Sequence, residues 1–290
     1  MNNMMLNVPE IYESTIHTCI KKTKKKISQT FIAGAFAGAF IALGGFGAAM
    51  GSHAIENFSL AKLAAGLIFP VGLMLVLLCG AELFTGNSLL IIPLVEKKIT
   101  IRSLLKNWTI VYLSNFVGAF IIVLLIFYSD LLGSNHDALG GYAIKIAAYK
   151  CNLSFTNALA SGILCNFIVT LTVWASYAAK DVVSKIAVVW FPIMTFVVCG
   201  FEHSVANMYY LFIGLLAKGN PEFIYSSHIS EASVESINIA NIIKNLIPVT
   251  IGNIIGGAVF VGLAFWVMLK YNYPKSSLII DTDNFQEDIN

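Results

Sequence analysis

Charged residues are scarce in this sequence. They make up only 12% of its 290 residues, whereas a soluble domain carries about 25%. Hydrophobic residues make up 57%, and the mean hydropathy is +0.77. A chain with so little charge cannot cover a water-facing surface of ordinary polarity, so the composition predicts an all-α membrane protein.

The motifs of common enzyme classes are also absent. The sequence has no Walker A motif, no G-x-G-x-x-G between a strand and a helix, no H-E-x-x-H and no G-x-S-x-G. Its five cysteines form no C-x-x-C pair and no metal-ligand spacing with histidine, so we expect neither a metal site nor a cofactor. Residues 1–26 lack the apolar core of a cleavable signal peptide.

Long apolar stretches dominate what remains. About 20 apolar residues are needed to cross the hydrocarbon core of a bilayer. Six regions meet this requirement, at roughly 28–50, 62–95, 107–132, 155–179, 186–217 and 245–270. We therefore expect a cytoplasmic N-terminal segment (1–27), a six-span domain (28–270, with repeats 28–132 and 155–270) and a cytoplasmic C-terminal tail (271–290).

The positive charges set the expected orientation. Most of the Lys and Arg residues fall inside if both termini are cytoplasmic, and the run KKTKKK supplies many of them. Lysine and arginine accumulate on the cytoplasmic side of membrane proteins. The sequence therefore predicts a multi-pass protein of the plasma (inner) membrane with both ends inside.

Two apolar regions are interrupted by related sequences, CGAELFTGN at 79–87 and CGFEHSVAN at 199–207. Cys, Gly, Glu and Asn recur at the same offsets in both. A glycine, a carboxylate and an amide at membrane depth persist only where broken backbone is buried in protein or lines a cavity. Two such breaks at matching places predict a transport site near the middle of the bilayer.

The repeat extends to the spans that follow each break. NFVGAFIIVLL starts at Asn115 and NIIGGAVFVGL starts at Asn253. Each half has three spans, and an odd number makes the second half enter from the opposite side. The halves are therefore expected to form an inverted 3+3 repeat, with the two broken helices approaching the bilayer centre from opposite faces.

Several polar residues in or near the breaks are candidates for function. His203 is ionisable at membrane depth, which favours a functional role over a structural one. Glu82 and Glu202 are expected to hold the loops in shape by accepting hydrogen bonds from N–H groups at helix starts. Lys150, just before the fourth span, is either solvated or concentrates anions at a pore mouth. The buried amides either line the path or bridge the loops; they are Asn87, Asn166, Asn207 and Asn253.

Apolar residues flank the same breaks. They either pack in the core and against lipid or form constrictions that exclude water and hydrated ions. These residues are Phe69, Leu73, Leu83, Phe84 and Phe196. A neutral-solute channel of the aquaporin type is an alternative function, although the paired NPA motifs are absent. A membrane-embedded redox enzyme is another, but among the five histidines only His203 lies at pore depth.

Three segments together resemble the formate/nitrite transporter family. LCGAELFTGN is similar to its first break, FEHSVANMY to its second, and IPVTIGNIIGGA to its sixth span. The resemblance covers about residues 28–270. It implies an aquaporin-like fold with one pore per subunit and a homopentamer in the membrane, and it implies a channel or transporter, not an enzyme.

The resemblance also implies roles for individual residues. His203 corresponds to the pore histidine, Lys150 to the vestibule lysine and Thr85 to a loop threonine. Asn166, Asn207 and Asn253 match pore amides, and the apolar residues named above match constriction positions. Glu82 departs from the aspartate that formate channels often have.

Family members carry formate, acetate, lactate, nitrite or hydrosulfide. The apolar Leu83 and Phe196 favour formate and other short monocarboxylates, with nitrite or hydrosulfide as the alternative. A bare charge is costly between apolar constrictions, so we expect crossing as the neutral acid, with a proton from water or from His203. No nucleic acid is expected among the partners.

Overall fold

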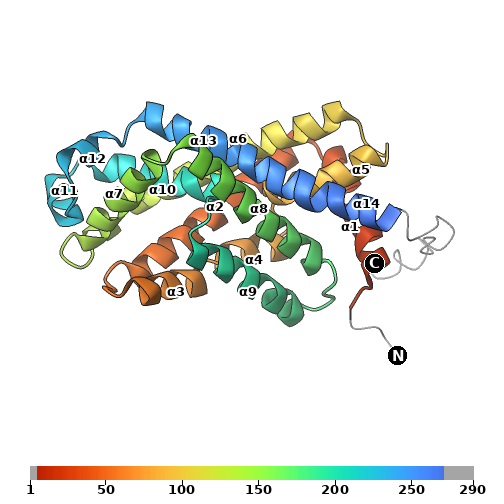
Figure 1. Cartoon of the computed structure of the whole chain (residues 1–290), viewed down its shortest axis with the longest axis horizontal. Helices are drawn as coiled ribbons and strands as arrows, with labels where there is room; N and C mark the ends of the chain where they lie inside the picture. Colours follow the sequence, from red (N-terminus) through yellow and green to blue (C-terminus); the bar gives the residue numbers. More distant parts are fainter. Residues whose placement is uncertain (1–4, 271–290) are drawn as a thin grey trace.

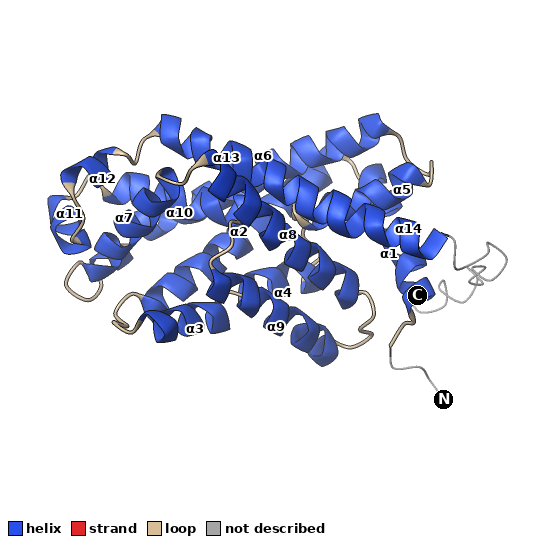
Figure 2. Ribbon diagram, viewed as in Figure 1, coloured by secondary structure: helices blue, strands red, loops and turns tan. Residues whose placement is uncertain are grey.

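The computed structural model describes residues 5–270, which form helices joined by loops, with one isolated β-bridge between Met5 and Ala179 (Figure 2). The predicted tail at 271–290 lies outside the described residues. Six helices within the described range are long and apolar enough to cross a membrane, as the sequence predicts. They are Ile27–Ser52, Phe58–Leu78, Ile101–Tyr128, Phe155–Ser176, Val182–Cys199 and Ile239–Lys270.

The first half begins after an amphipathic helix, α1 (Val8–Lys24). It consists of α2 (Ile27–Ser52), α3 (Phe58–Ile68), α4 (Val71–Leu78), η1 (Gly86–Leu90), α5 (Ile91–Val95) and α6 (Ile101–Tyr128). The connection between the halves contains η2 (Leu131–Gly133) and α7 (Ala138–Cys151). Neither α1 nor α7 was expected from the sequence.

The second half repeats the order with longer insertions. It consists of α8 (Phe155–Ser176), α9 (Val182–Cys199), α10 (Ser204–Ala217), α11 (Pro221–Ser227), α12 (Glu231–Glu235), α13 (Ile239–Ile254), the π-helix η3 (Ile255–Leu263) and α14 (Ala264–Lys270). The broken second span is thus α3–α4 followed by η1–α5, and the broken fifth span is α9 followed by α10.

Side-chain caps fix where the main spans begin. Thr100 accepts a hydrogen bond from the backbone N–H of Ser103 at the start of α6, and Ser154 accepts one from Asn157 at the start of α8. Asn238 does the same for Asn241 at the start of α13. Each cap satisfies an N–H group that the first helical turn leaves without a partner.

The two halves pack in corresponding ways. Helix α2 packs along α6, and α8 packs along α13 and η3. The small residues of α2 make the first contact close, because a Cβ on Gly38 would overlap the backbone of Asn115. This small-residue stripe therefore packs within the subunit. Helices α3 and α9 lie side by side, and α7, α11 and α12 gather at the end of the molecule opposite α1, α5 and α14 (Figure 1).

Candidate functional site

The first segment of each broken span ends in the same backbone turn. Gly80 and Gly200 have φ values of +69° and +74°, in the left-handed region that glycine adopts without strain. The next residue in each case closes the turn, with Ala81 N–H donating to Val76 O (2.9 Å) and Phe201 N–H donating to Phe196 O (3.1 Å). This Schellman-type closure ends the helix and redirects the chain into the middle of the protein.

A buried asparagine from the following span clamps each loop. Asn115 donates to Gly34 O (2.8 Å) and Glu82 O (2.9 Å), and its Oδ1 accepts from Phe84 N–H (2.9 Å). Because these three bonds use the polar atoms of its side chain, Asn115 serves the loop. The sequence repeat shows Asn115, but the candidate residues did not include it.

Asn253 makes the equivalent clamp in the second half. It donates to Gly162 O (2.8 Å) and Glu202 O (3.0 Å), and its Oδ1 accepts from Ser204 N–H (2.9 Å). Asn166 lies beside it and donates to Asn253 O (2.6 Å), Ser88 Oγ (3.0 Å) and Thr85 O (3.3 Å). Of the two readings left open for these amides, the geometry corresponds to bridging the loops.

At the end of the molecule near α1, hereafter the α1 side, a carboxylate is paired with two lysines. Glu82 lies 2.7 Å from Lys25 Nζ and 3.3 Å from Lys22 Nζ, and accepts from Asn87 Nδ2 (3.0 Å). Asn87 also donates to Asn107 Oδ1 (2.9 Å) and accepts from Lys22 Nζ (2.6 Å). Burial of Lys22 favours its neutral form, but the Glu82 carboxylate outweighs this and raises the pKa of Lys22 above its ordinary value.

The opposite side, hereafter the α7 side, has a related cluster with one lysine. Lys150, in the last turn of α7, donates to Glu202 Oε1 (2.8 Å), and Asn207 donates to Glu202 Oε2 (2.6 Å) and to Asn245 Oδ1 (2.8 Å). Here Asn207 Oδ1, although buried, has no partner among the described residues. Asn207 Oδ1 on the α7 side therefore lacks a donor, whereas the equivalent Asn87 Oδ1 on the α1 side accepts from the Lys22 ammonium group.

These contacts correct one sequence expectation. Glu82 and Glu202 were expected to accept hydrogen bonds from N–H groups at helix starts, and that detail is wrong because their carboxylates contact lysine and asparagine side chains. Lys22 and Lys25 were not among the expected site residues, because they stand in a basic run that looks solvated. Asn107 and Asn245 were not expected either, although each precedes its clamp asparagine by eight residues.

His203 lies between the two clusters and contacts the opposite loop. Its Nε2 is 2.9 Å from Thr85 Oγ1, and its Nδ1 accepts from Ala206 N–H (3.1 Å). Because Nδ1 acts as an acceptor, the ring proton resides on Nε2 and points to the threonine hydroxyl. The structure thus brings together Thr85 of the first break and His203 of the second.

An apolar cavity of about 10 Å³ adjoins this imidazole. Its lining residues are Ile41, Phe69, Leu73, Leu83, Val169, Ile193, Phe196 and His203. The rings of Phe69 and Phe196 meet edge to face, with centroids 5.5 Å apart. Four of the five predicted constriction residues therefore surround one space in which His203 is the only polar side chain.

Phe84 lies elsewhere. Its ring packs against Tyr112 and Trp108, with centroids 4.9 Å and 6.0 Å away, and it is not among the residues that line this cavity. No group of three or more His, Cys, Asp or Glu that could hold a metal ion occurs within residues 5–270.

This chain is similar in sequence to known channels and transporters. Residues 9–267 match the sequence model described as "Formate/nitrite transporter". The formate channel FocA of Escherichia coli K12 is 39% identical over 214 residues, covering 73% of this chain and 75% of its own. The uncharacterized transporter YrhG of Bacillus subtilis is 39% identical over 264 residues, covering 89% and 91%.

The fold is similar to that of solved channels. A structure titled "Pentameric formate channel with formate bound" superimposes with a TM-score of 0.79 at 33% identity, covering 86% of this chain and 99% of its own. A second, titled "FNT family ion channel", gives a TM-score of 0.76 at 25% identity, covering 91% and 99%. Because the family model matches residues 9–267 and FocA of Escherichia coli K12 is 39% identical over 73% of this chain, this protein belongs to the formate/nitrite transporter family.

Proposed function

We propose that this protein carries formate and related small monocarboxylates across the plasma (inner) membrane, as a homopentamer with one pore per subunit. Its relatives include formate channels, and a pentameric formate channel shares its fold. It acts as a transporter and not as an enzyme. Both termini lie in the cytoplasm, so that the α1 side faces inward and the α7 side outward.

The observation that carries this proposal is the apolar cavity between two lysine–glutamate–asparagine clusters. Lysine ammonium groups in both clusters attract small anions. The apolar lining around His203 then favours a neutral species, because a bare charge at that position is costly. Formate is small and becomes neutral formic acid by taking up one proton, which fits this lining.

Formate is proposed to take up a proton from water before it enters the cavity. The side-chain oxygen Oδ1 of Asn207 is a buried acceptor without a partner among the described residues, and it lies beside Lys150 and Glu202. It can accept a hydrogen bond from the O–H group of a protonated acid. His203 then donates a hydrogen bond from Nε2 in place of its bond to Thr85. Transport on this route moves one proton with each formate.

The test is formate uptake into proteoliposomes with an imposed pH gradient. Lys150→Ala is expected to raise the half-saturating formate concentration, and His203→Gln to change the pH dependence and the selectivity of uptake. Lys145→Ala is the matched control, because Lys145 is an exposed lysine on the same helix. Competition by acetate, lactate, nitrite and hydrosulfide ranks the substrates.

Unchanged rate, selectivity and pH dependence in both Lys150→Ala and His203→Gln would contradict the proposed route. Rapid water or glycerol flux that is indifferent to pH would instead favour the neutral-solute channel.

A further inference from the structure

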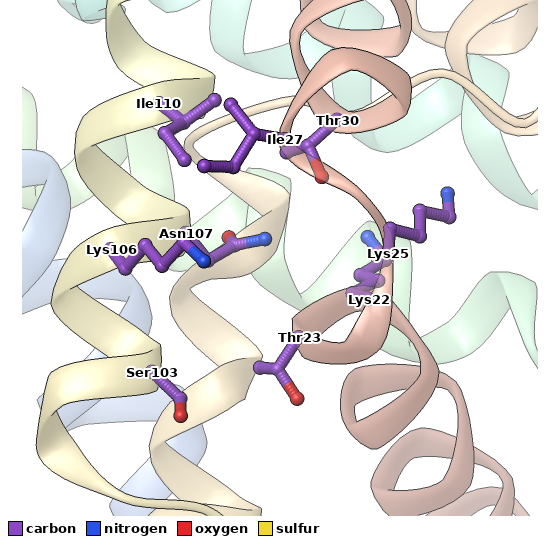
Figure 3. Close-up of a pocket in the computed structure, with 9 residues that line it drawn as sticks. All are labelled: Lys22, Thr23, Lys25, Ile27, Thr30, Ser103, Lys106, Asn107 and Ile110. Carbon is purple, nitrogen blue, oxygen red and sulfur yellow. The ribbon is translucent and has the colours of Figure 1, made fainter.

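The two lysine–glutamate–asparagine clusters differ in where the lysine ammonium group lies. On the α1 side, Lys22 Nζ lies 3.3 Å from Glu82 Oε2 and donates to Asn87 Oδ1 (2.6 Å), so it bridges the carboxylate and the amide. Figure 3 shows Lys22 beside Lys25 at the α1–α2 junction, where both line a cavity of about 10 Å³ with room for about one water. A lysine in such a cluster can therefore reach both of the other members.

On the α7 side, the lysine does not bridge. Lys150 Nζ donates to Glu202 Oε1 (2.8 Å), and Asn207 Nδ2 donates to the other oxygen of the same carboxylate (2.6 Å). Asn207 Oδ1 is buried and has no partner among the described residues. A buried acceptor without a donor is costly, so the position of the nearby ammonium group needs a physical cause.

A tyrosine ring provides that cause. Lys150 Nζ lies over the ring of Tyr210, 5.5 Å from its centroid. The face of an aromatic ring attracts a cation within about 6 Å, and more strongly where water is excluded. The Lys150 side chain is only 11% exposed. Tyr210 follows Asn207 by three residues, and the residue at the same offset on the α1 side is Leu90, which has no aromatic face.

The Tyr210 ring is held in place by contacts that do not involve Lys150. Its hydroxyl donates to Gly45 O on α2 (3.4 Å). A Cβ on Gly45 would lie 3.4 Å from Tyr210 Cζ and 2.8 Å from Tyr209 Cδ1, so the glycine lets both rings pack against α2. The two rings also meet, with centroids 5.0 Å apart. The aromatic face is therefore a fixed feature of the fold.

We propose that Tyr210 is a positioning residue that holds the Lys150 ammonium group away from Asn207 Oδ1, so that this oxygen stays open to a hydrogen-bond donor on the transported molecule. The second part rests on the proposed function, in which the donor is the O–H group of the protonated acid. Without the ring, Lys150 adopts the bridging arrangement of Lys22. Asn207 Oδ1 then accepts from an ammonium group and no longer binds the acid.

The first test is structural and needs no substrate. In the structure of Tyr210→Leu, which introduces the residue type of the α1 side, Lys150 Nζ is expected within about 3.2 Å of Asn207 Oδ1. In Tyr210→Phe it is expected to stay in place, because the ring remains. Tyr210→Met replaces Tyr210→Leu if the leucine variant does not fold. An ammonium group that does not approach Asn207 Oδ1 in the variant without a ring would overturn the proposal, as would one that approaches it in Tyr210→Phe.

Transport provides the second readout. For formate uptake by Tyr210→Leu, the half-saturating concentration is expected to rise about fivefold, because the ammonium group now competes with the acid for one oxygen. The maximal rate is expected to stay unchanged, since enough substrate displaces the competitor. Tyr210→Phe should behave as the unmodified protein. Tyr225→Leu is the control, because Tyr225 is 79% exposed on α11, on the same side of the molecule.

The two readouts separate this proposal from the proposed function. If the unmodified protein fails to carry formate, yet Lys150 moves to Asn207 in Tyr210→Leu, the positioning role stands and the proposed substrate fails. A lower maximal rate in Tyr210→Leu with an unchanged half-saturating concentration would overturn the link between the ring and substrate binding. Equal effects of Tyr210→Phe and Tyr210→Leu on uptake would overturn it as well.

Discussion

The two lysine–glutamate pairs should respond differently to loss of the carboxylate charge. Lys150 and Glu202 are 2.8 Å apart, with side chains only 11% and 3% exposed. Glu202→Gln leaves a buried ammonium group without a counter-ion, which costs about 3 kcal/mol or more. On the α1 side, Lys25 is 36% exposed, so after Glu82→Gln it can turn into water, and Lys22, which is 16% exposed, keeps its hydrogen bond to Asn87 Oδ1. The loss there is expected to be smaller, about 1 to 2 kcal/mol.

The assay is the fraction of detergent-solubilised protein that stays folded after graded heating, measured by size-exclusion chromatography. We expect Glu202→Gln to lose its folded peak at a clearly lower temperature than Glu82→Gln. The double variant Lys150→Met/Glu202→Gln should recover most of the loss, because it leaves neither charge buried alone. Equal losses in Glu202→Gln and Glu82→Gln would refute the reasoning. So would a double variant whose loss equals the sum of the losses in Lys150→Met and Glu202→Gln alone.

Three further predictions follow from the buried contacts. Thr85→Val removes the only hydroxyl that His203 Nε2 contacts, so formate uptake should fall and its pH profile should change, while Thr85→Ser should preserve both. Asn115→Ala and Asn253→Ala each remove three hydrogen bonds and should each destabilise the folded protein by about 3 kcal/mol in the same heating assay; a difference above about 1 kcal/mol would contradict their equivalence. Burial raises the pKa of Cys19 from 9.0 to about 12, so maleimide at pH 8 should label Cys19 only after denaturation. Since the unfolded chain loses the Cys19 proton first, stability should fall as pH rises from about 9 to about 12, and less steeply in Cys19→Ala.

The main architecture was predictable because it depends on short-range properties of the sequence. Six apolar stretches, two interruptions at matching positions and an odd number of spans per half lead to the inverted repeat without knowledge of any contact. The same repeat placed Glu82 with Asn87 and Glu202 with Asn207 at the two breaks.

The roles of individual polar side chains were harder to predict from the sequence. Asn253 and Asn166 are asparagines at membrane depth, and residue type alone allows them either to face a pore or to tie a loop. The direction in which each side-chain amide points depends on the rotation of its helix about its axis and on which backbone carbonyls lie nearby. Phe84 is a similar case, since its ring packs on Tyr112 and Trp108 and not in the cavity.

By itself, the sequence determined that this chain spans a membrane six times as an inverted repeat, with a histidine and two carboxylates at its breaks. Only the tertiary structure decided that α1 folds back to place Lys22 and Lys25 on Glu82, and that Lys150 from α7 fills the related position on Glu202. The physical reason is that apolar length and periodicity are encoded locally. The pairing of buried charges instead depends on segments far apart in the chain, which meet only when the helices pack.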